Sequence, residues 1–261
     1  MPGKLYLGTN TKMYKTAAQT EEFLTALDTL TKEIGREELE LFVIPSFTAL
    51  ERARKCVPRE RIRIGAQNMG WEAQGEFTGE ISPLMLKETG ADIVEIGHSE
   101  RRHKLGETDE QENQKVLCAL DYGFTPLLCI GETAAQKHYD LGPEVLRTQL
   151  KIGLYGVHPE QARKIMVAYE PVWAIGVGGK PAGKEYAARM HRIIRETLLE
   201  LLGEVGNHVP VLYGGSVNQE NAGDLILIPD IDGLFIGRSA WDAENFSRII
   251  HRVLPLFQNR S

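Results

Sequence analysis

The sequence predicts an α/β protein whose single domain, residues 1–261, is a closed (β/α)8 barrel. Three observations lead to this prediction: eight short apolar runs recur along the chain, amphipathic helical patterns separate them, and 261 residues suit one such barrel. No linker-like or low-complexity segment divides the sequence. A doubly wound open sheet is the alternative, but no GxGxxG motif follows the first run, which disfavours a dinucleotide-binding fold.

The predicted strands share near-continuous hydrophobicity, which is typical of parallel strands buried on both faces. In chain order they cover 5–10, 39–45, 62–68, 92–98, 125–132, 164–171, 209–215 and 231–237.

The predicted helices show apolar residues at helical spacing. Over 18–35 the apolar face is Phe23, Leu27, Leu30 and Ile34, and Gly35 ends the helix. Over 184–203 the corresponding stripe is Tyr186, Met190, Ile193, Thr197 and Leu201. His191 lies beside this second stripe, and we expect it at the surface rather than as a ligand.

Composition excludes several classes of partner. Hydrophobic residues make up 42% of the chain and charged residues 25%, so a sizeable core can form. The formal net charge is −6 with basic and acidic residues intermixed, which argues against nucleic acid or an anionic membrane surface as a partner. The three cysteines form no CxxC pair, as suits a reducing compartment. No signal-like N-terminus and no apolar run of about 18 residues is present, so we expect a cytoplasmic protein.

Polar residues follow three of the predicted strands, at the barrel end where active sites of this fold lie. Asn10 and Lys12 follow the first strand, His98 the fourth and Glu170 the sixth. Each alone could form a salt bridge or lie on a solvated rim. Together, Lys, His and Glu at one end of a barrel indicate a proton-transfer site, and we expect neither a metal nor a cofactor.

Glycine-rich loops follow the last two predicted strands. They read YGGSV at 213–217 and FIGRSA at 235–240, and supply Ser216 and Gly237. Each loop alone could be a tight turn that needs glycine. As a pair in these two positions, they predict a cradle of backbone N–H groups for phosphate.

Seven motifs, in barrel order, make the chain resemble the triosephosphate isomerase family over essentially its whole length. They are GTNTKMY (8–14), AQNMGWEAQGEFTGEIS (66–82), EIGHSERR (95–102), LLCIGE (127–132), AYEPVWAIGVGG (168–179), YGGSV (213–217) and DGLFIG (232–237). The resemblance implies a TIM barrel and an aldose–ketose isomerase that moves a proton through an enediolate.

The resemblance also implies a role for each polar residue. Glu170 would be the base and His98 the neutral electrophile, because a helix N-terminus follows it. Lys12 would supply the positive charge for the phosphate and the oxyanion, and Asn10 an orienting amide. Glu100 is similar to the family's buried acid near this lysine, with a structural ion pair as the alternative.

The segment after Glu170 resembles the family's mobile lid. Residues 171–173 would be a stiff hinge, 174–176 the tip and 177–179 a pliable hinge. Gly176 would then donate its backbone N–H to the phosphate, and the closed lid would exclude water.

The long loop from Gly65 to Glu80 implies a homodimer. In the family this loop inserts into a second subunit, so Thr78 would reach the partner's Asn10 and the partner's Lys12. Trp71 would be buried in that interface.

Two departures from the family pattern bear on the substrate. Thr11 and Tyr14 stand where the family usually has tryptophan and often asparagine, which leaves more room beside Lys12. After the eighth strand, Arg238 interrupts the usual pair of glycines. Its side chain could pair with an acid such as Asp242, or bind the substrate with its fork of donors.

These departures are similar to those of a divergent branch that isomerises four-carbon sugar phosphates, the erythrulose phosphate isomerases. We therefore predict a tetrulose phosphate isomerase that converts L-erythrulose 1-phosphate to D-erythrose 4-phosphate. The alternative is a triosephosphate isomerase acting on dihydroxyacetone phosphate and D-glyceraldehyde 3-phosphate.

A phosphosugar-binding barrel without activity has no use for Lys12, His98 and Glu170 together. A phosphate-eliminating lyase could use the same base.

Overall fold

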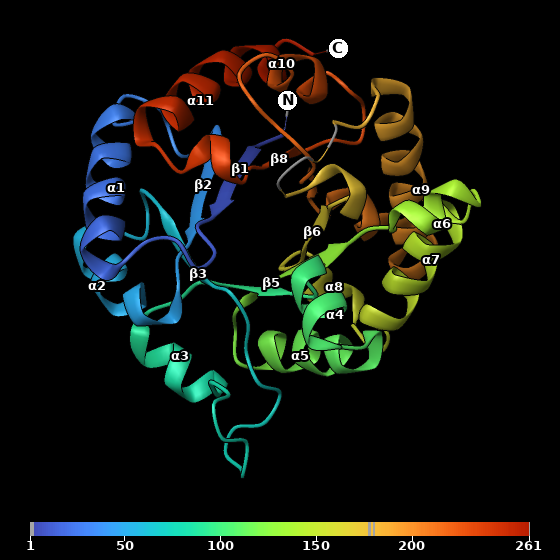
Figure 1. Cartoon of the computed structure of the whole chain (residues 1–261), viewed down its shortest axis with the longest axis horizontal. Coiled ribbons are helices and arrows are strands. Elements are labelled where there is room, and N and C mark those ends of the chain that lie inside the picture. Colours follow the sequence, from blue (N-terminus) through green and yellow to red (C-terminus); the bar gives the residue numbers. More distant parts are fainter. Residues whose placement is uncertain (1–2, 177–178, 180, 261) are drawn as a thin grey trace.

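The computed structural model describes residues 3–176, 179 and 181–260, which contain eight strands closed into one barrel (Figure 1). The strands are β1 (Leu5–Asn10), β2 (Leu39–Ile44), β3 (Arg63–Ala66), β4 (Ile93–Ile96), β5 (Thr125–Ile130), β6 (Met166–Tyr169), β7 (Val211–Tyr213) and β8 (Gly233–Phe235). All neighbours are parallel, and β8 closes the barrel by pairing with β1. The predicted barrel is confirmed, and each predicted run contains one strand. The domain boundaries at 1 and 261 stay a prediction.

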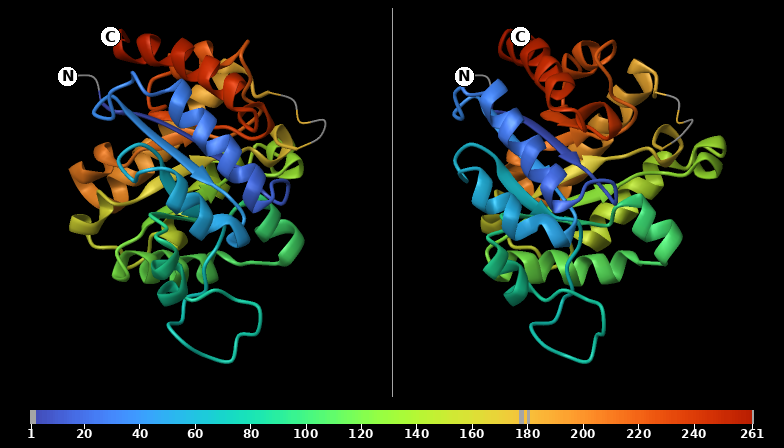
Figure 2. Two further views of the ribbon diagram at one scale, coloured as in Figure 1. Left: turned by 90° about the vertical axis from the view of Figure 1, so that its left-hand side faces the viewer. Right: turned by 60° about the vertical axis from the view of Figure 1, so that its left-hand side comes forward.

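Helices surround the strands on the outside of the barrel (Figures 1 and 2). They are α1 (Ala17–Leu30), α2 (Leu50–Cys56), α3 (Pro83–Thr89), α4 (Ser99–Leu105), α5 (Asp109–Asp121), α6 (Ala134–His138), α7 (Gly142–Gly153), α8 (Pro159–Ala162), α9 (Lys184–Leu202), α10 (Ala222–Ile226) and α11 (Ala243–Gln258). The predicted first helix ends earlier than expected, at Leu30. No helix in the described part of the chain is both long and apolar enough to cross a membrane.

Apolar side chains fill two separate regions. One lies inside the barrel and includes Phe42, Ile93 and Leu127. The larger one lies between the strands and the helices, as expected for strands buried on both faces. The barrel interior is therefore filled with side chains, and only those at the end of the barrel can contact a substrate.

The expectation that His191 lies at the surface is wrong. Its side chain is fully buried on α9, edge-on to Tyr169 with 5.5 Å between ring centroids. Its Nδ1 atom lies 3.2 Å from the Asp230 carbonyl oxygen. Burial lowers the pKa of His191 to about 3. The buried face of α9 is centred about one residue further along than the predicted stripe, because His191, Ile194 and Leu198 are buried. Tyr186, Ile193 and Leu201 of the stripe are only half-buried.

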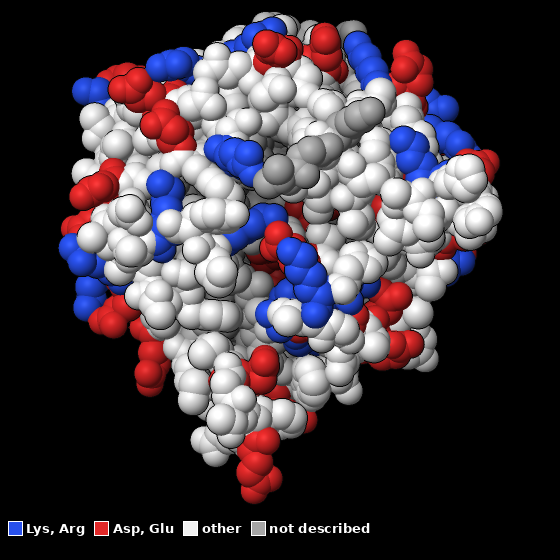
Figure 3. Space-filling model, viewed as in Figure 1, with Lys and Arg blue, Asp and Glu red and all other residues white. Residues whose placement is uncertain are grey.

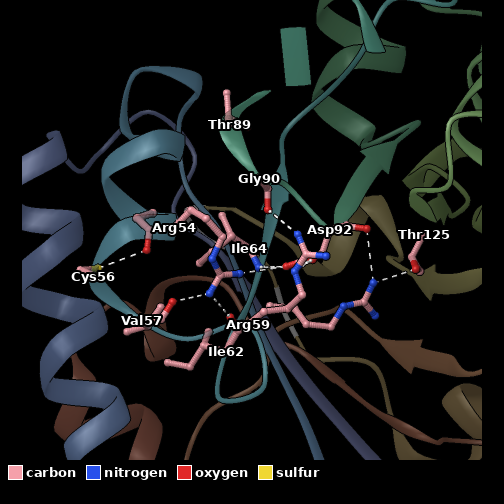
Figure 4. Close-up of polar contacts among 12 residues, drawn as sticks. Arg54, Cys56, Val57, Arg59, Ile62, Ile64, Thr89, Gly90, Asp92 and Thr125 are labelled. Carbon is pink, nitrogen blue, oxygen red and sulfur yellow. Dashed lines mark hydrogen bonds and ion pairs between the residues drawn. The ribbon is translucent and has the colours of Figure 1, made fainter. Parts of the chain in front are cut away.

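An ion-pair network ties the amino end of β4 to the chain before β3 (Figure 4). Asp92 accepts a hydrogen bond of 3.0 Å from Arg54 Nη1 and lies 2.8 Å from Arg59 Nε. It also accepts the backbone N–H of Ile64 at 3.0 Å. These contacts lie at the barrel end opposite the strand termini that carry the predicted site, where side chains of this fold serve stability.

Candidate active site

The predicted site residues line one pocket of about 400 Å³ at the carboxyl ends of the strands. Eight of them border it: Asn10, Lys12, His98, Glu170, Gly176, Ser216, Gly237 and Arg238. Figure 3 shows this face, where basic and acidic side chains are interspersed around the central hollow. Thr78 is not part of the pocket, since it is exposed on the segment 67–82 that projects from the barrel (Figures 1 and 2).

Glu170 enters the pocket directly after β6 and is 5% exposed. Its backbone N–H donates to the Ile130 carbonyl at 2.7 Å, which fixes the backbone there. A Cβ atom at Gly214 would lie 2.6 Å from Cγ of Glu170, so this glycine makes room for the carboxylate. In the described part of the chain, Glu170 Oε2 is buried without a hydrogen-bond partner. The carboxylate is thus held in place with one oxygen uncommitted.

His98 caps α4 through its own imidazole. Its Nδ1 atom accepts the backbone N–H of Glu100 at 3.1 Å, so the ring proton of the neutral tautomer lies on Nε2. Nε2 in turn lies 3.6 Å from Glu170 Oε2. The helix end therefore aims an N–H donor at the pocket.

Lys12 adopts a left-handed backbone conformation, with φ at 51°, which is rare for residues other than glycine. Its ammonium group pairs with Glu100 at 2.9 Å. Burial by itself would lower the Lys12 pKa, but the hydrogen bond to Glu100 and the nearby carboxylates of Glu170, Glu100 and Glu95 together raise it. The Glu100 side chain is 42% exposed, so the expected buried acid is only half-buried.

Sequence reasoning missed a second acid, Glu95 on β4. It is fully buried inside the barrel, where its Oε2 accepts a hydrogen bond of 2.5 Å from Asn10 Nδ2. Its Oε1 lies 3.8 Å from the Cys129 thiol. Burial first, and then the charge of Glu170, raises the pKa of Glu95 well above its usual value. The signal in the sequence was an acid in the middle of the apolar run 92–98, apart from Asp92 at its start.

The segment after Glu170 is anchored at Trp173 and Ala174. Trp173 Nε1 donates to Glu132 at 2.7 Å, and Tyr186 donates to the same oxygen at 2.9 Å. Ser216 Oγ donates to the Ala174 carbonyl at 2.7 Å, which connects the loop after β7 to this segment. The predicted second hinge falls partly on residues 177 and 178, which lie outside the described residues. Glu132 was also missed, although it ends the predicted strand 125–132.

The loop after β8 brings an exposed arginine and an indole to the pocket rim. Among the residues that the structure describes, no ion pair joins Arg238 to Asp242, which instead caps α11 by accepting the Asn245 N–H at 2.8 Å. Trp241 Nε1 donates to the Asn10 carbonyl at 2.9 Å, and its ring packs on Tyr14 with centroids 4.5 Å apart. The wall beside Lys12 is therefore aromatic despite Thr11. Within residues 3–176, 179 and 181–260, no group of three or more His, Cys, Asp or Glu is placed to hold a metal ion.

Comparison with known proteins agrees with this geometry. A family model described as triosephosphate isomerase matches residues 5–253. The chain belongs to the triosephosphate isomerase family. Relatives named L-erythrulose-1-phosphate isomerase include those of Rhizobium etli, 48% identical over 95% of this chain and 92% of the relative, and Rhizobium meliloti, 46% identical over 95% and 96%. One from Brucella abortus is 45% identical over 98% of both chains. The family and these relatives indicate an isomerase.

Proposed function

We propose that the protein is a tetrulose phosphate isomerase that acts on L-erythrulose 1-phosphate through an enediolate. The observation that carries this proposal is the convergence of Lys12, His98 and Glu170 on one pocket, in a chain 48% identical to an isomerase named for that sugar.

The proton transfer is assigned to Glu170. Its carboxylate takes the proton from the carbon beside the carbonyl and returns it to the former carbonyl carbon. The His98 Nε2–H donates to the oxygens that carry the developing negative charge, and the Lys12 ammonium balances it. The 3.6 Å between Glu170 Oε2 and His98 Nε2 supports this division, since both groups face the same small volume.

One such transfer moves the carbonyl by one carbon. On L-erythrulose 1-phosphate it moves from C2 to C3 and gives erythrulose 4-phosphate, with no atoms gained or lost. D-Erythrose 4-phosphate, the predicted product, would need a second transfer along the chain. We therefore propose erythrulose 4-phosphate as the product of a single turnover.

The phosphate is assigned to the loops after β6, β7 and β8. Backbone N–H groups of Gly176, Ser216 and Gly237 would bind it, because all three residues border the pocket. A Cβ atom at Gly237 would meet no atom within 4 Å, so a side chain there would enter the space that we assign to the ligand. Arg238, which follows Gly237 in the same loop, would add donors to the substrate.

Steady-state rates test the substrate. The proposal predicts a higher kcat/KM for L-erythrulose 1-phosphate than for D-erythrulose 1-phosphate or dihydroxyacetone phosphate. Faster turnover of dihydroxyacetone phosphate would favour triosephosphate isomerase activity instead. Release of inorganic phosphate as the main reaction would favour a lyase, and no reaction with any sugar would favour a binding protein.

We also propose a cytoplasmic homodimer. Residues 74–80 are exposed at the tip of segment 67–82 (Figure 2), and Phe77 there is 47% exposed while packing on Trp71. A cavity of about 510 Å³ between this segment and Arg101 would accept the partner's loop. Light scattering tests this state: twice the chain mass is expected, with Thr78→Arg weakening the dimer, whereas a fully active monomer would contradict it. The free thiols of Cys56, Cys118 and Cys129 support the location.

A further inference from the structure

Glu95 is a buried acid with no part in the proton transfer described above. It follows Ile93 by two residues on β4, so both side chains face the barrel interior. The interior around Ile93 is apolar, and a carboxyl group placed there is unfavourable unless it is hydrogen-bonded. Glu95 is fully buried, and among the residues that the structure describes its donors are Asn10 Nδ2, which is strong, and the Cys129 thiol, which is weak. This placement points to a role for Glu95 that involves its hydrogen bond with Asn10.

The contacts of Asn10 determine which way its amide faces. Its Oδ1 accepts the backbone N–H of Lys12 at 2.6 Å and Gln67 Nε2 at 3.0 Å. Its Nδ2 therefore faces Glu95, and a flipped amide would set donor against donor at Lys12. Glu95 supplies the acceptor that this orientation needs.

The turn at Lys12 depends on the same amide. A lysine with φ at 51° is held in an unfavourable conformation by its surroundings. Asn10 Oδ1 holds its N–H, and Gln67 Nε2 donates to its carbonyl oxygen at 2.8 Å. A chain of hydrogen bonds thus runs from Glu95 through Asn10 to the backbone that carries the Lys12 ammonium.

We propose that Glu95 is a positioning residue for the isomerisation: its carboxyl group accepts the Asn10 Nδ2 hydrogen and thereby fixes the turn that presents Lys12 to the substrate. This inference rests on the proposed function. The role needs an acceptor oxygen and not a charge, because a protonated carboxyl group still offers its carbonyl oxygen to Asn10. The raised pKa of Glu95, caused by burial and by Glu170, agrees with a neutral group.

The test compares an isosteric variant that keeps the acceptor with variants that remove it. Glu95→Gln should keep kcat/KM within about threefold of the wild type, since its amide oxygen can accept from Asn10. Glu95→Met should lower kcat/KM at least tenfold while the protein remains folded by circular dichroism. If Glu95→Met does not fold, Glu95→Ile takes its place, because a β-branched residue suits a strand. An apolar variant with kcat/KM within threefold of the wild type overturns the proposal, and so does a tenfold loss in Glu95→Gln.

A double-mutant cycle separates positioning from a general structural role. If Glu95 acts through Asn10, then Glu95→Met should change kcat/KM less than about twofold in an Asn10→Ala background. If the fold loss of kcat/KM in the double variant equals the product of the losses in the two single variants, the inference is contradicted. The kcat/KM of each variant is expressed as a ratio to that of its parent enzyme. All rates are measured with the sugar phosphate that the wild type isomerises best. A wrong substrate assignment therefore appears in the wild-type rates, whereas failure of the Glu95 inference appears in the ratios.

Discussion

Glu170 Oε2 lies 3.6 Å from His98 Nε2, and both residues are 5% exposed at the end of the barrel. Their positions have separate local causes. The missing side chain of Gly214 makes room for the carboxylate, and the Glu100 N–H in the first turn of α4 fixes the imidazole. A substrate bound between them would meet a base on one side and a neutral N–H donor on the other. This closeness of Glu170 and His98 is the basis of the proposed chemistry.

Shortening the base should abolish most of the turnover. Glu170→Asp withdraws the carboxylate by one methylene, and a misplacement of about 1 Å can reduce a rate on the order of 100-fold. We expect kcat to fall by about that factor or more, with KM within severalfold of the wild type, because the phosphate contacts are unchanged. Initial-rate kinetics measure both constants. Near-normal kcat in this variant would remove Glu170 as the base.

The indole of Trp173 should help to hold residues 171–176 over the pocket. Trp173→Phe loses the hydrogen bond to Glu132, worth about 1 kcal/mol and thus about fivefold in an equilibrium. We expect a lower kcat and a larger fraction of substrate lost as free phosphate, since the enediolate would be exposed to water more often. Tyr186→Phe is the matched control, because it removes another hydrogen bond to Glu132 from α9. Equal phosphate release in both variants would contradict this role.

Arg238 should contribute to the choice of substrate. It borders the pocket and its side chain is exposed, so Arg238→Gly removes donors without leaving a cavity in the core. We expect the ratio of kcat/KM for L-erythrulose 1-phosphate to that for dihydroxyacetone phosphate to fall. Ser239→Ala in the same loop serves as the control. An unchanged ratio in Arg238→Gly would make the arginine a structural residue and remove its place in the substrate argument.

His191 should make the fold less stable in acid. Its folded-state pKa of about 3 lies below the ordinary value of 6.5, so below pH 6.5 the unfolded chain binds a proton that the folded protein does not. The free energy of unfolding should therefore fall as the pH drops from 6.5 towards 3, by up to about 1.4 kcal/mol per pH unit from this group. Urea unfolding at pH 7 and pH 5 measures the loss. His191→Phe should show a smaller loss between these pH values, and an equal loss in both proteins would refute the assignment.

Much of the architecture could be predicted because buried parallel strands require continuous apolar runs, and polar residues that end such runs stand out. Lys12, His98 and Glu170 were found in this way. Glu95 was missed because a single acid inside an apolar run gives no indication of a partner, and its partner Asn10 is 85 residues away. His191 was misplaced because three of the five residues of the predicted stripe lie at the edge of the buried face, whose centre is about one position further along the helix. The half-buried state of Glu100 depends on how α4 is oriented, which no local pattern encodes.

The most direct test of the central claim is turnover of L-erythrulose 1-phosphate in deuterated buffer, followed by NMR. The proposed mechanism predicts erythrulose 4-phosphate that carries deuterium at the carbon beside the carbonyl, with Glu170→Asp forming it at least about 100-fold more slowly. Recovery of the sugar unchanged and unlabelled from the wild-type enzyme would refute this mechanism.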